Sequence, residues 1–240
     1  MRVAVVTGAA GDIGQATAHA FARSGHALVL LDRTPAPLPA GAEGLAQPCD
    51  LANPGEVAEA FAVIAARFPR LDALVNIAGI NHRAPVAEMR IEDWDRMMDV
   101  NVGAMFLTCK HAIPLMTGEG AAIVNMASIS GHVASRDYPA YVASKAAVES
   151  FTWALSGEVG PHIRVNAIAP GWVAAGFTRA ALETSADPAA LEEKARAAHL
   201  LGRMAVPSEV AAAIIWLTSA KASFVTGETL FVDGGLMRVH

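Results

Sequence analysis

The sequence has few cysteines, no cluster of basic residues and no long apolar run. Its two cysteines, Cys49 and Cys109, form neither a C-x-x-C pair nor a secreted disulfide pattern, which suggests a reducing compartment. The 18 lysines and arginines are scattered and the formal net charge is −5, which argues against a non-specific nucleic-acid surface. No uncharged apolar run approaches the roughly 18 residues of a membrane span. We therefore expect a soluble, cytoplasmic protein that acts on a small molecule.

Apolar, β-rich segments alternate with alanine-rich segments of helical spacing. The predicted strands are residues 3–7, 27–32, 73–79, 121–128, 163–170 and 228–235. Val57, Phe61 and Ile64 illustrate the helical spacing between them. Strands that are apolar almost throughout and alternate with helices indicate a parallel sheet covered on both faces. The sequence thus predicts an α/β fold with a doubly wound parallel sheet, a Rossmann-like three-layer single domain over residues 1–240.

Residues 174–203 interrupt this alternation with charged, helical material such as "DPAALEEKARAAH". We interpret these residues as a flap over the site, and the alternative is a plain surface helix. We call them the flap segment.

The stretch "TGAAGDIG" (7–14) joins an apolar strand to a helix through three glycines, Gly8, Gly11 and Gly14. Such a turn can hold a dinucleotide diphosphate on bare backbone N–H groups, although it can also merely let helix and strand pack closely. Asp32 ends the next predicted strand, where a carboxylate can accept hydrogen bonds from ribose hydroxyls. This favours NAD over NADP, and the neighbouring Arg33 is either a partner for a 2'-phosphate or a solvated loop residue.

Tyr141 and Lys145 lie four residues apart in "YVASK", in a segment predicted to be helical. Both side chains therefore leave the same helix face. A lysine ammonium beside a phenol favours the phenolate and is expected to lower the pKa of Tyr141, which makes it a proton donor and acceptor near neutrality. A surface Tyr/Lys pair is the alternative for such a spacing in isolation.

Several motifs occur together and in order along the chain. They are "TGAAGDIG", "CDL" (49–51), "NIAG" (76–79), "VNVGAMF" (100–106), "NMASISG" (125–131), "YVASK", "NAIAPGWV" (166–173) and "SFVTGETLFVDGG" (223–235). This set resembles the short-chain dehydrogenase/reductase family, in its NAD-dependent type with an Asn-Ser-Tyr-Lys tetrad. Ser128 precedes Tyr141 by 13 residues, as in the family pattern, and Asn101 falls at the family's fourth catalytic position.

The resemblance implies an oxidoreductase that moves a hydride between NAD(H) and a secondary alcohol or ketone. Tyr141 would donate or accept the proton on the substrate oxygen, and Ser128 would hydrogen-bond that oxygen. Lys145 would assist Tyr141 and bind the nicotinamide ribose, and Asn101 would support a water in the proton relay. The alternatives are a 3-oxoacyl-thioester reductase that uses NADPH and, more distantly, a catalytically silent nucleotide-sensing protein.

The resemblance also assigns cofactor contacts. Besides Tyr141 and Lys145, they are Gly8, Gly11, Asp12, Ile13, Gly14, Asp32, Asp50, Leu51, Asn76, Ala78, Gly79, Pro170, Gly171 and Val173. The chain departs from the family at Ile77, where a second asparagine is usual, at Ala175, where a threonine is usual, and at Asp12, which replaces a glycine. We interpret Asp12 as a helix N-cap forming a capping box with Gln15, because a carboxylate in a phosphate cradle needs another purpose. A metal ligand is the rival interpretation.

For the substrate, the loops that border the pocket in this family contain His82, His132 and Trp172, and exposed loop or packing positions are the alternative for each. None of the eight histidines has a metal-ligand spacing, so no metal is expected. Helices over residues 91–116 and 140–159 usually pair between subunits in the family, which implies a homo-oligomer, a dimer or tetramer.

Overall fold

The computed structural model describes residues 1–133 and 135–238, and within them a seven-stranded sheet forms the centre of the molecule. The strands are β1 (Arg2–Thr7), β2 (His26–Asp32), β3 (Gly44–Pro48), β4 (Ala73–Asn76), β5 (Ala121–Met126), β6 (Ile163–Pro170) and β7 (Thr229–Val232). Their order is β3-β2-β1-β4-β5-β6-β7, and each neighbouring pair is parallel. The predicted doubly wound parallel sheet is thus confirmed.

β3 is the strand that the sequence pattern did not predict. Its residues, GLAQP, are half-buried or exposed and lack the continuous apolar character of the inner strands. It pairs only with β2, at the edge of the sheet, and it ends at Pro48. An edge strand has one unpaired side and so tolerates proline, which removes the usual signature of a parallel strand.

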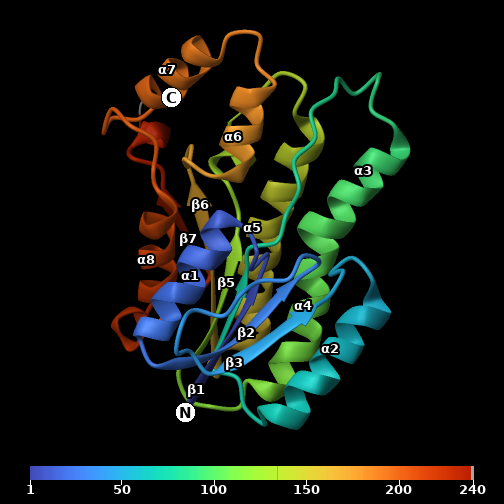
Figure 1. Cartoon of the computed structure of the whole chain (residues 1–240), viewed down its shortest axis with the longest axis vertical. Helices are drawn as coiled ribbons and strands as arrows, with labels where there is room; N and C mark the ends of the chain where they lie inside the picture. The colour runs from blue at the N-terminus through green and yellow to red at the C-terminus, as the bar shows by residue number, and fades with distance from the viewer. Residues whose placement is uncertain (134, 239–240) are drawn as a thin grey trace.

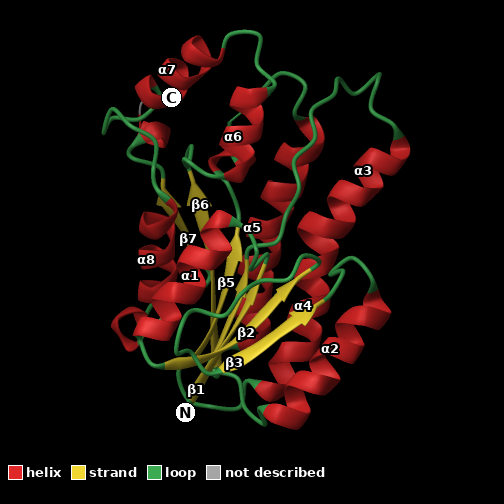
Figure 2. Cartoon of the chain, viewed as in Figure 1, coloured by secondary structure: helices red, strands yellow, loops and turns green. Residues whose placement is uncertain are grey.

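Helices cover both faces of the sheet, as Figures 1 and 2 show. They are α1 (Asp12–Arg23), α2 (Pro54–Arg67), α3 (Ile91–Met98), α4 (Ala104–Ala112), α5 (Pro139–Val159), α6 (Gly176–Glu183), α7 (Pro188–Ala197) and α8 (Pro207–Thr218). α1 and α8 pack together on one face, and α2, α4 and α5 lie on the other. α6 and α7, both within the flap segment, lie beyond the carboxyl ends of the strands (Figure 1).

The core consists of two apolar layers, one on each face of the sheet. Along β1, Val3 and Val5 belong to the layer beneath α2, α4 and α5, whereas Ala4 and Val6 belong to the layer beneath α1 and α8. This alternation follows from the two-residue period of a strand. Because both faces are covered, both sets are apolar, and each fully buried valine contributes roughly 1.5–3 kcal/mol relative to an exposed one.

The helix expected over residues 91–116 is present but irregular. α3 runs into a π-helical turn, Asp99–Gly103, before α4 continues, and a 3-10 turn over Ile113–Leu115 follows. Asn101 is the buried residue of that π-helical turn. Single π turns inside helices occur often at functional sites, because they turn one side chain out of the regular helical position.

Both cysteines are free and buried. Burial raises the pKa of Cys49 to about 11 and that of Cys109 to about 12, so both thiols stay protonated near neutral pH. Among the helices in the described part of the chain, none combines the length and apolarity needed to cross a bilayer.

Candidate active site

A cleft of about 320 Å³ opens at the carboxyl ends of the strands. It lies where the strand order reverses, between β1 and β4, which is where ligands bind in open parallel sheets. Most of the cofactor contacts implied by the sequence line it. They are Gly8, Gly11, Asp12, Ile13, Gly14, Asp32, Asp50, Leu51, Ala78, Gly79, Tyr141, Lys145, Pro170, Gly171 and Val173. The cleft thus brings together residues from position 8 to position 173 of the 240-residue chain.

The glycine turn between β1 and α1 forms one wall of the cleft. Gly8 has a φ of +63°, and a Cβ there would lie 2.7 Å from the backbone nitrogen of Ala78. Only glycine therefore lets the turn lie this close to the end of β4. The turn leads into the N-terminus of α1, where backbone N–H groups without helical partners favour anions. This cradle fits the diphosphate of a dinucleotide, and Gly8, Gly11 and Gly14 would hold it.

Asp12 is not the helix cap that the sequence suggested. The N-cap of α1 is Gly11 and lacks a side-chain cap, while Asp12 is the first residue of the helix. Gln15 donates its side-chain amide to the carbonyl of Ala9 at 2.7 Å, so the capping box is not formed. The Asp12 carboxylate instead pairs with the guanidinium of Arg179 in α6, Oδ2 to Nη2 at 3.0 Å. The expectation of a cap was wrong because Arg179, 167 residues away, offers a charged partner.

Asp32, at the end of β2, closes the opposite side of the glycine turn. One carboxylate oxygen accepts the backbone N–H of Ala10 and the other that of Thr34, each at 3.0 Å. A carboxylate oxygen has two lone pairs, so each oxygen retains an acceptor position for a ribose hydroxyl. Asp32 therefore fixes the turn and keeps acceptor positions that could take ribose hydroxyls. Arg33 lies beside it along the cleft and is exposed.

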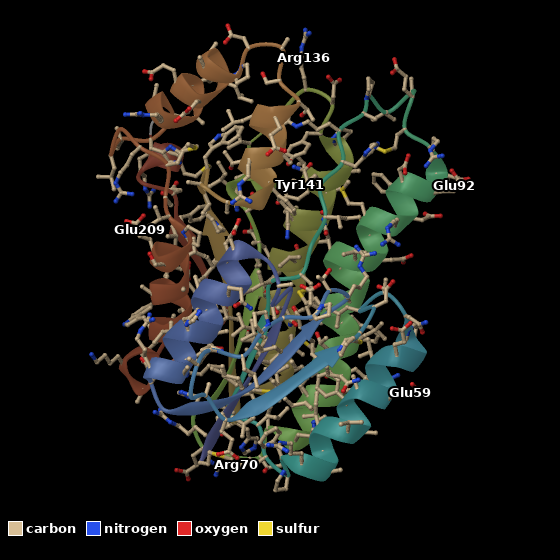
Figure 3. All side chains as sticks on the ribbon, in the orientation of Figure 1. Glu59, Arg70, Glu92, Arg136, Tyr141 and Glu209 are labelled. Atoms are coloured by element: carbon tan, nitrogen blue, oxygen red, sulfur yellow. The ribbon has the colours of Figure 1, made fainter. Side chains whose placement is uncertain are left out.

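Ser128, Tyr141 and Lys145 converge at one end of the cleft. Ser128 follows β5, whereas Tyr141 and Lys145 lie one turn apart on α5, and the Lys145 ammonium is 5.6 Å from the centre of the Tyr141 ring. Lys145 donates to the carbonyl of Met126 at 2.8 Å, which fixes its long side chain. Figure 3 shows Tyr141 inside the molecule near α6, in contrast to the peripheral Glu92 and Glu59.

The expected lowering of the Tyr141 pKa by Lys145 is contradicted. Burial raises the pKa of Tyr141 above its ordinary value, a negative charge on Tyr138 would raise it further, and the hydrogen bond with Ser128 lowers it. Burial also lowers the pKa of Lys145 to about 8. Enclosure of both side chains thus outweighs the attraction between a phenolate and an ammonium.

Asn101 and Asn76 lie behind the cleft, in the interior. The Asn101 amide accepts the backbone N–H of Ile80 at 2.8 Å and donates to the Ile80 carbonyl and to Ser144 Oγ, at 3.0 and 2.9 Å. It thereby connects the segment after β4 to α5.

Asn76, assigned to the cofactor by resemblance, donates to Asn125 at 2.9 Å and accepts from Thr108 at 2.7 Å. The Asn76 side chain therefore crosslinks β4, β5 and α4 and leaves the cleft to Ala78 and Gly79.

The three tentative substrate residues lie outside the lining of the cleft. His82 is exposed and 3.8 Å from the carboxylate of Asp93. His132 is 2.7 Å from the carboxylate of Glu149, and Trp172 is anchored through its backbone. They make no contact with this cleft, and their assignment to the substrate stays a prediction. Apolar side chains form the wall beside Tyr141 instead, namely Ile80 and Phe177.

Two residues of the flap segment, His199 and Thr178, make site contacts that no sequence motif predicts. The buried His199 accepts the backbone N–H of Trp172 at Nε2, 3.2 Å, and its Nδ1 donates to the carbonyl of Ala195 at 2.7 Å. It thereby attaches the turn after β6 to the end of α7. Thr178, in α6, is buried and lines the cleft. It follows by three residues Ala175, which stands where the family usually has threonine. Neither residue belongs to a motif that the sequence displays.

Comparisons with known proteins agree with this geometry. A sequence model described as "Enoyl-(Acyl carrier protein) reductase" matches residues 8–237. D-threitol dehydrogenase of Mycolicibacterium smegmatis is 36% identical over 98% of this chain and 92% of its own length. The 3-oxoacyl-[acyl-carrier-protein] reductase FabG of Thermotoga maritima is 34% identical over 98% of both chains.

A solved structure, the aldohexose dehydrogenase of Thermoplasma acidophilum in ligand-free form, has a TM-score of 0.92 to this fold. It shares 33% sequence identity over 99% of this chain and 94% of its own. Both the sequence match and the fold therefore extend over nearly the whole chain. With its parallel sheet, glycine turn and Ser-Tyr-Lys cluster, the chain belongs to the short-chain dehydrogenase/reductase family of oxidoreductases.

Proposed function

We propose that this chain is an NAD(H)-dependent oxidoreductase that interconverts small secondary alcohols and ketones. The observation that carries the proposal is the layout of one cleft. One end of the cleft contains the side chains of Ser128, Tyr141 and Lys145. Asp32 lies beside the glycine turn that would hold the dinucleotide. A bound nicotinamide cofactor would supply the hydride chemistry that the side chains lack.

The chain's own residues handle the proton and the substrate oxygen. The Tyr141 hydroxyl, hydrogen-bonded to Ser128, donates a proton to the carbonyl oxygen in reduction and accepts it back in oxidation. The Ser128 hydroxyl donates a second hydrogen bond to that oxygen as negative charge develops on it. Lys145, held by the Met126 carbonyl, places a positive charge beside Tyr141 that favours loss of the phenolic proton during oxidation.

The wall beside Tyr141 supports a compact substrate with an apolar face. Ile80 packs against the apolar cluster that contains Tyr141, and the ring of Phe177 meets that of Tyr141 edge-on, with centroids 6.5 Å apart. Cyclic and alkyl secondary alcohols match such walls, and the similarity to D-threitol and aldohexose dehydrogenases adds polyols and sugars to the substrate class.

The second candidate is reduction of a 3-oxoacyl thioester with NADPH. Its support is the similarity to FabG, which nearly equals that to D-threitol dehydrogenase. It requires a site for a 2'-phosphate, and the carboxylate of Asp32 opposes such a group at the place where the ribose would lie. We therefore place this candidate second.

The test is a panel of secondary alcohols, polyols and aldohexoses with NAD, beside a 3-oxoacyl thioester with NADPH. NAD reduction by at least one alcohol is expected, and exclusive thioester reduction would establish the second candidate.

On the best substrate, Tyr141→Phe should lower turnover by a factor of about 10² to 10⁴, the usual contribution of a general acid or base. Tyr138→Phe is the matched control, because it removes the other tyrosine hydroxyl of the chain and should keep turnover. Undiminished turnover of Tyr141→Phe would refute the mechanism.

We also propose that the chain forms a homo-oligomer through α4 and α5. Trp153 on α5 and Phe106 on α4 are 73% and 49% exposed, a large apolar area for a free surface. Light scattering of the wild type and of Trp153→Glu tests this. We expect a dimer or tetramer that the glutamate dissociates, whereas a wild-type monomer would contradict the proposal.

A further inference from the structure

Asp12 and Arg179 form an ion pair across the mouth of the cleft. The carboxylate Oδ2 and the guanidinium Nη2 are 3.0 Å apart, although 167 positions separate the two residues. Asp12 starts α1 at the glycine turn, and Arg179 belongs to α6 in the flap segment. Both side chains are partly exposed, 38% for Asp12 and 62% for Arg179. The pair therefore joins the turn that would hold the diphosphate to the flap segment.

The N-terminal half of α6 makes contacts at both ends of the cleft. Gly176 begins the helix next to Asp12, and a Cβ at Gly176 would lie 3.9 Å from the Asp12 carboxylate. One residue later, Phe177 meets the ring of Tyr141. Gly176, Phe177 and Thr178 line the cleft. The position of α6 is thus fixed at the phosphate end by a charge and at the catalytic end by an aromatic contact.

The carboxylate of Asp12 is unfavourable for an anion in the cradle. A dinucleotide diphosphate carries negative charge, and like charges a few ångströms apart repel strongly where solvent is partly excluded. Neutralisation by a nearby guanidinium removes most of that repulsion, and Arg179 is the guanidinium in contact with Asp12. Loss of Arg179 would leave a bare carboxylate in the cradle, whereas loss of both charges would leave the cradle neutral.

We propose that Arg179 is a cofactor-positioning residue. It neutralises Asp12 and thereby allows the glycine turn to accept the dinucleotide diphosphate. This inference rests on the proposed function, because it takes the diphosphate of a nicotinamide dinucleotide as the anion. It assigns a purpose to the aspartate that stands where the family has glycine.

The test measures the dissociation constant of NADH for four proteins: wild type, Arg179→Gln, Asp12→Asn and the double variant. Arg179→Gln should bind at least tenfold more weakly, by about 1.4 kcal/mol. Asp12→Asn should bind as tightly as wild type or more tightly, and the double variant should match Asp12→Asn. Rescue by the second substitution identifies charge neutralisation. If the pair served only as a mechanical tether, Asp12→Asn and the double variant would bind as weakly as Arg179→Gln, and that result would overturn the proposal.

Two further readouts accompany the binding measurement. High salt should shrink the difference between Arg179→Gln and wild type, because screening weakens the repulsion from Asp12. In steady state, the KM for the nucleotide should rise in Arg179→Gln, with kcat much less affected. Arg196→Gln, which removes an exposed arginine of α7 in the same flap segment, is the matched control and should bind like wild type. An Arg179→Gln variant that binds NADH within twofold of wild type would refute the assignment.

Failure of this inference is distinguishable from failure of the proposed function, because binding is measured without substrate. If the wild type prefers NADPH, the NAD assignment fails, and the same four proteins are compared with NADPH, which has the same diphosphate. If the wild type binds neither dinucleotide, the cofactor assignment and this inference both fall.

Discussion

The phenol ring of Tyr138 stacks on that of Tyr141, with ring centroids 4.7 Å apart and planes inclined by 26°. Arg83 belongs to the loop between β4 and α3, and its guanidinium lies 4.2 Å from the centroid of the Tyr138 ring. Tyr141 is therefore enclosed by Tyr138 on one side and by Phe177 of the flap segment on another. This enclosure explains why burial dominates the ionisation of both phenols.

An alkaline titration of the phenolate absorbance tests the state of these rings, because Tyr138 and Tyr141 are the only tyrosines in the sequence. Burial raises the pKa of Tyr138 to about 12 and raises that of Tyr141 as well. The folded protein without added nucleotide should therefore show little phenolate below pH 10. Tyr138→Phe should leave a single late transition. Phenolate formation between pH 7 and 9 would show that Lys145, as expected from sequence, overcomes burial.

The buried ammonium of Lys145 predicts a pH-dependent stability. Its pKa falls from 10.5 to about 8 on burial, so the unfolded chain binds more protons than the folded chain between these values. The free energy of unfolding should gain about 3 kcal/mol from this group as pH rises through the window, and lose it as pH falls through 8.

Denaturant unfolding of the wild type and Lys145→Met from pH 7 to 10.5 tests this contribution, because the variant lacks the titrating ammonium. The wild type should gain stability relative to the variant as pH rises. A difference that stays constant across the window would contradict the shifted lysine.

Asp32 should determine the proposed preference for NAD over NADP. Because its carboxylate also accepts the N–H groups of Ala10 and Thr34, Asp32→Ala would disturb the turn as well as the charge. Asp32→Asn keeps the shape and removes the charge, so it is the sharper variant. The ratio of kcat/KM for NAD to that for NADP should fall at least tenfold, since repulsion of a 2'-phosphate is lost. Arg33→Ala is the companion variant, because it tests whether Arg33 is a partner for a 2'-phosphate. A wild type that uses NADP as well as NAD would overturn the assignment of NAD as the cofactor.

His199 should stabilise the turn after β6. His199→Ala leaves the backbone N–H of Trp172 without its acceptor and opens space beside Gly171 and Gly234. An unpaired buried donor costs about 1–3 kcal/mol, and this donor is partly buried, so the free energy of unfolding should fall by about 1 kcal/mol or more. Chemical denaturation measures this, with the exposed His19→Ala of α1 as control. Equal losses of unfolding free energy in the two variants would argue against stabilisation of this turn by His199.

The family, the inner strands and the Ser-Tyr-Lys cluster were predictable from sequence because each depends on local pattern. Apolar runs determine buried parallel strands, and the four-residue spacing of Tyr141 and Lys145 puts them on one helix face wherever the helix lies. The edge strand β3 was not predictable, because its half-exposed residues carry no such apolar pattern.

Only the tertiary structure decided what each polar side chain contacts. Asp12 has the local pattern of a cap but pairs with Arg179 across the cleft, because an opposite charge is brought within 3.0 Å. Asn76 has a cofactor-motif position but crosslinks the core, since a buried amide must satisfy its hydrogen bonds there. Likewise, a short-range electrostatic rule predicted a lowered Tyr141 pKa, and burial by residues distant in sequence reversed it. Local pattern determined which elements form, and long-range packing determined the partners and ionisation of the residues at the site.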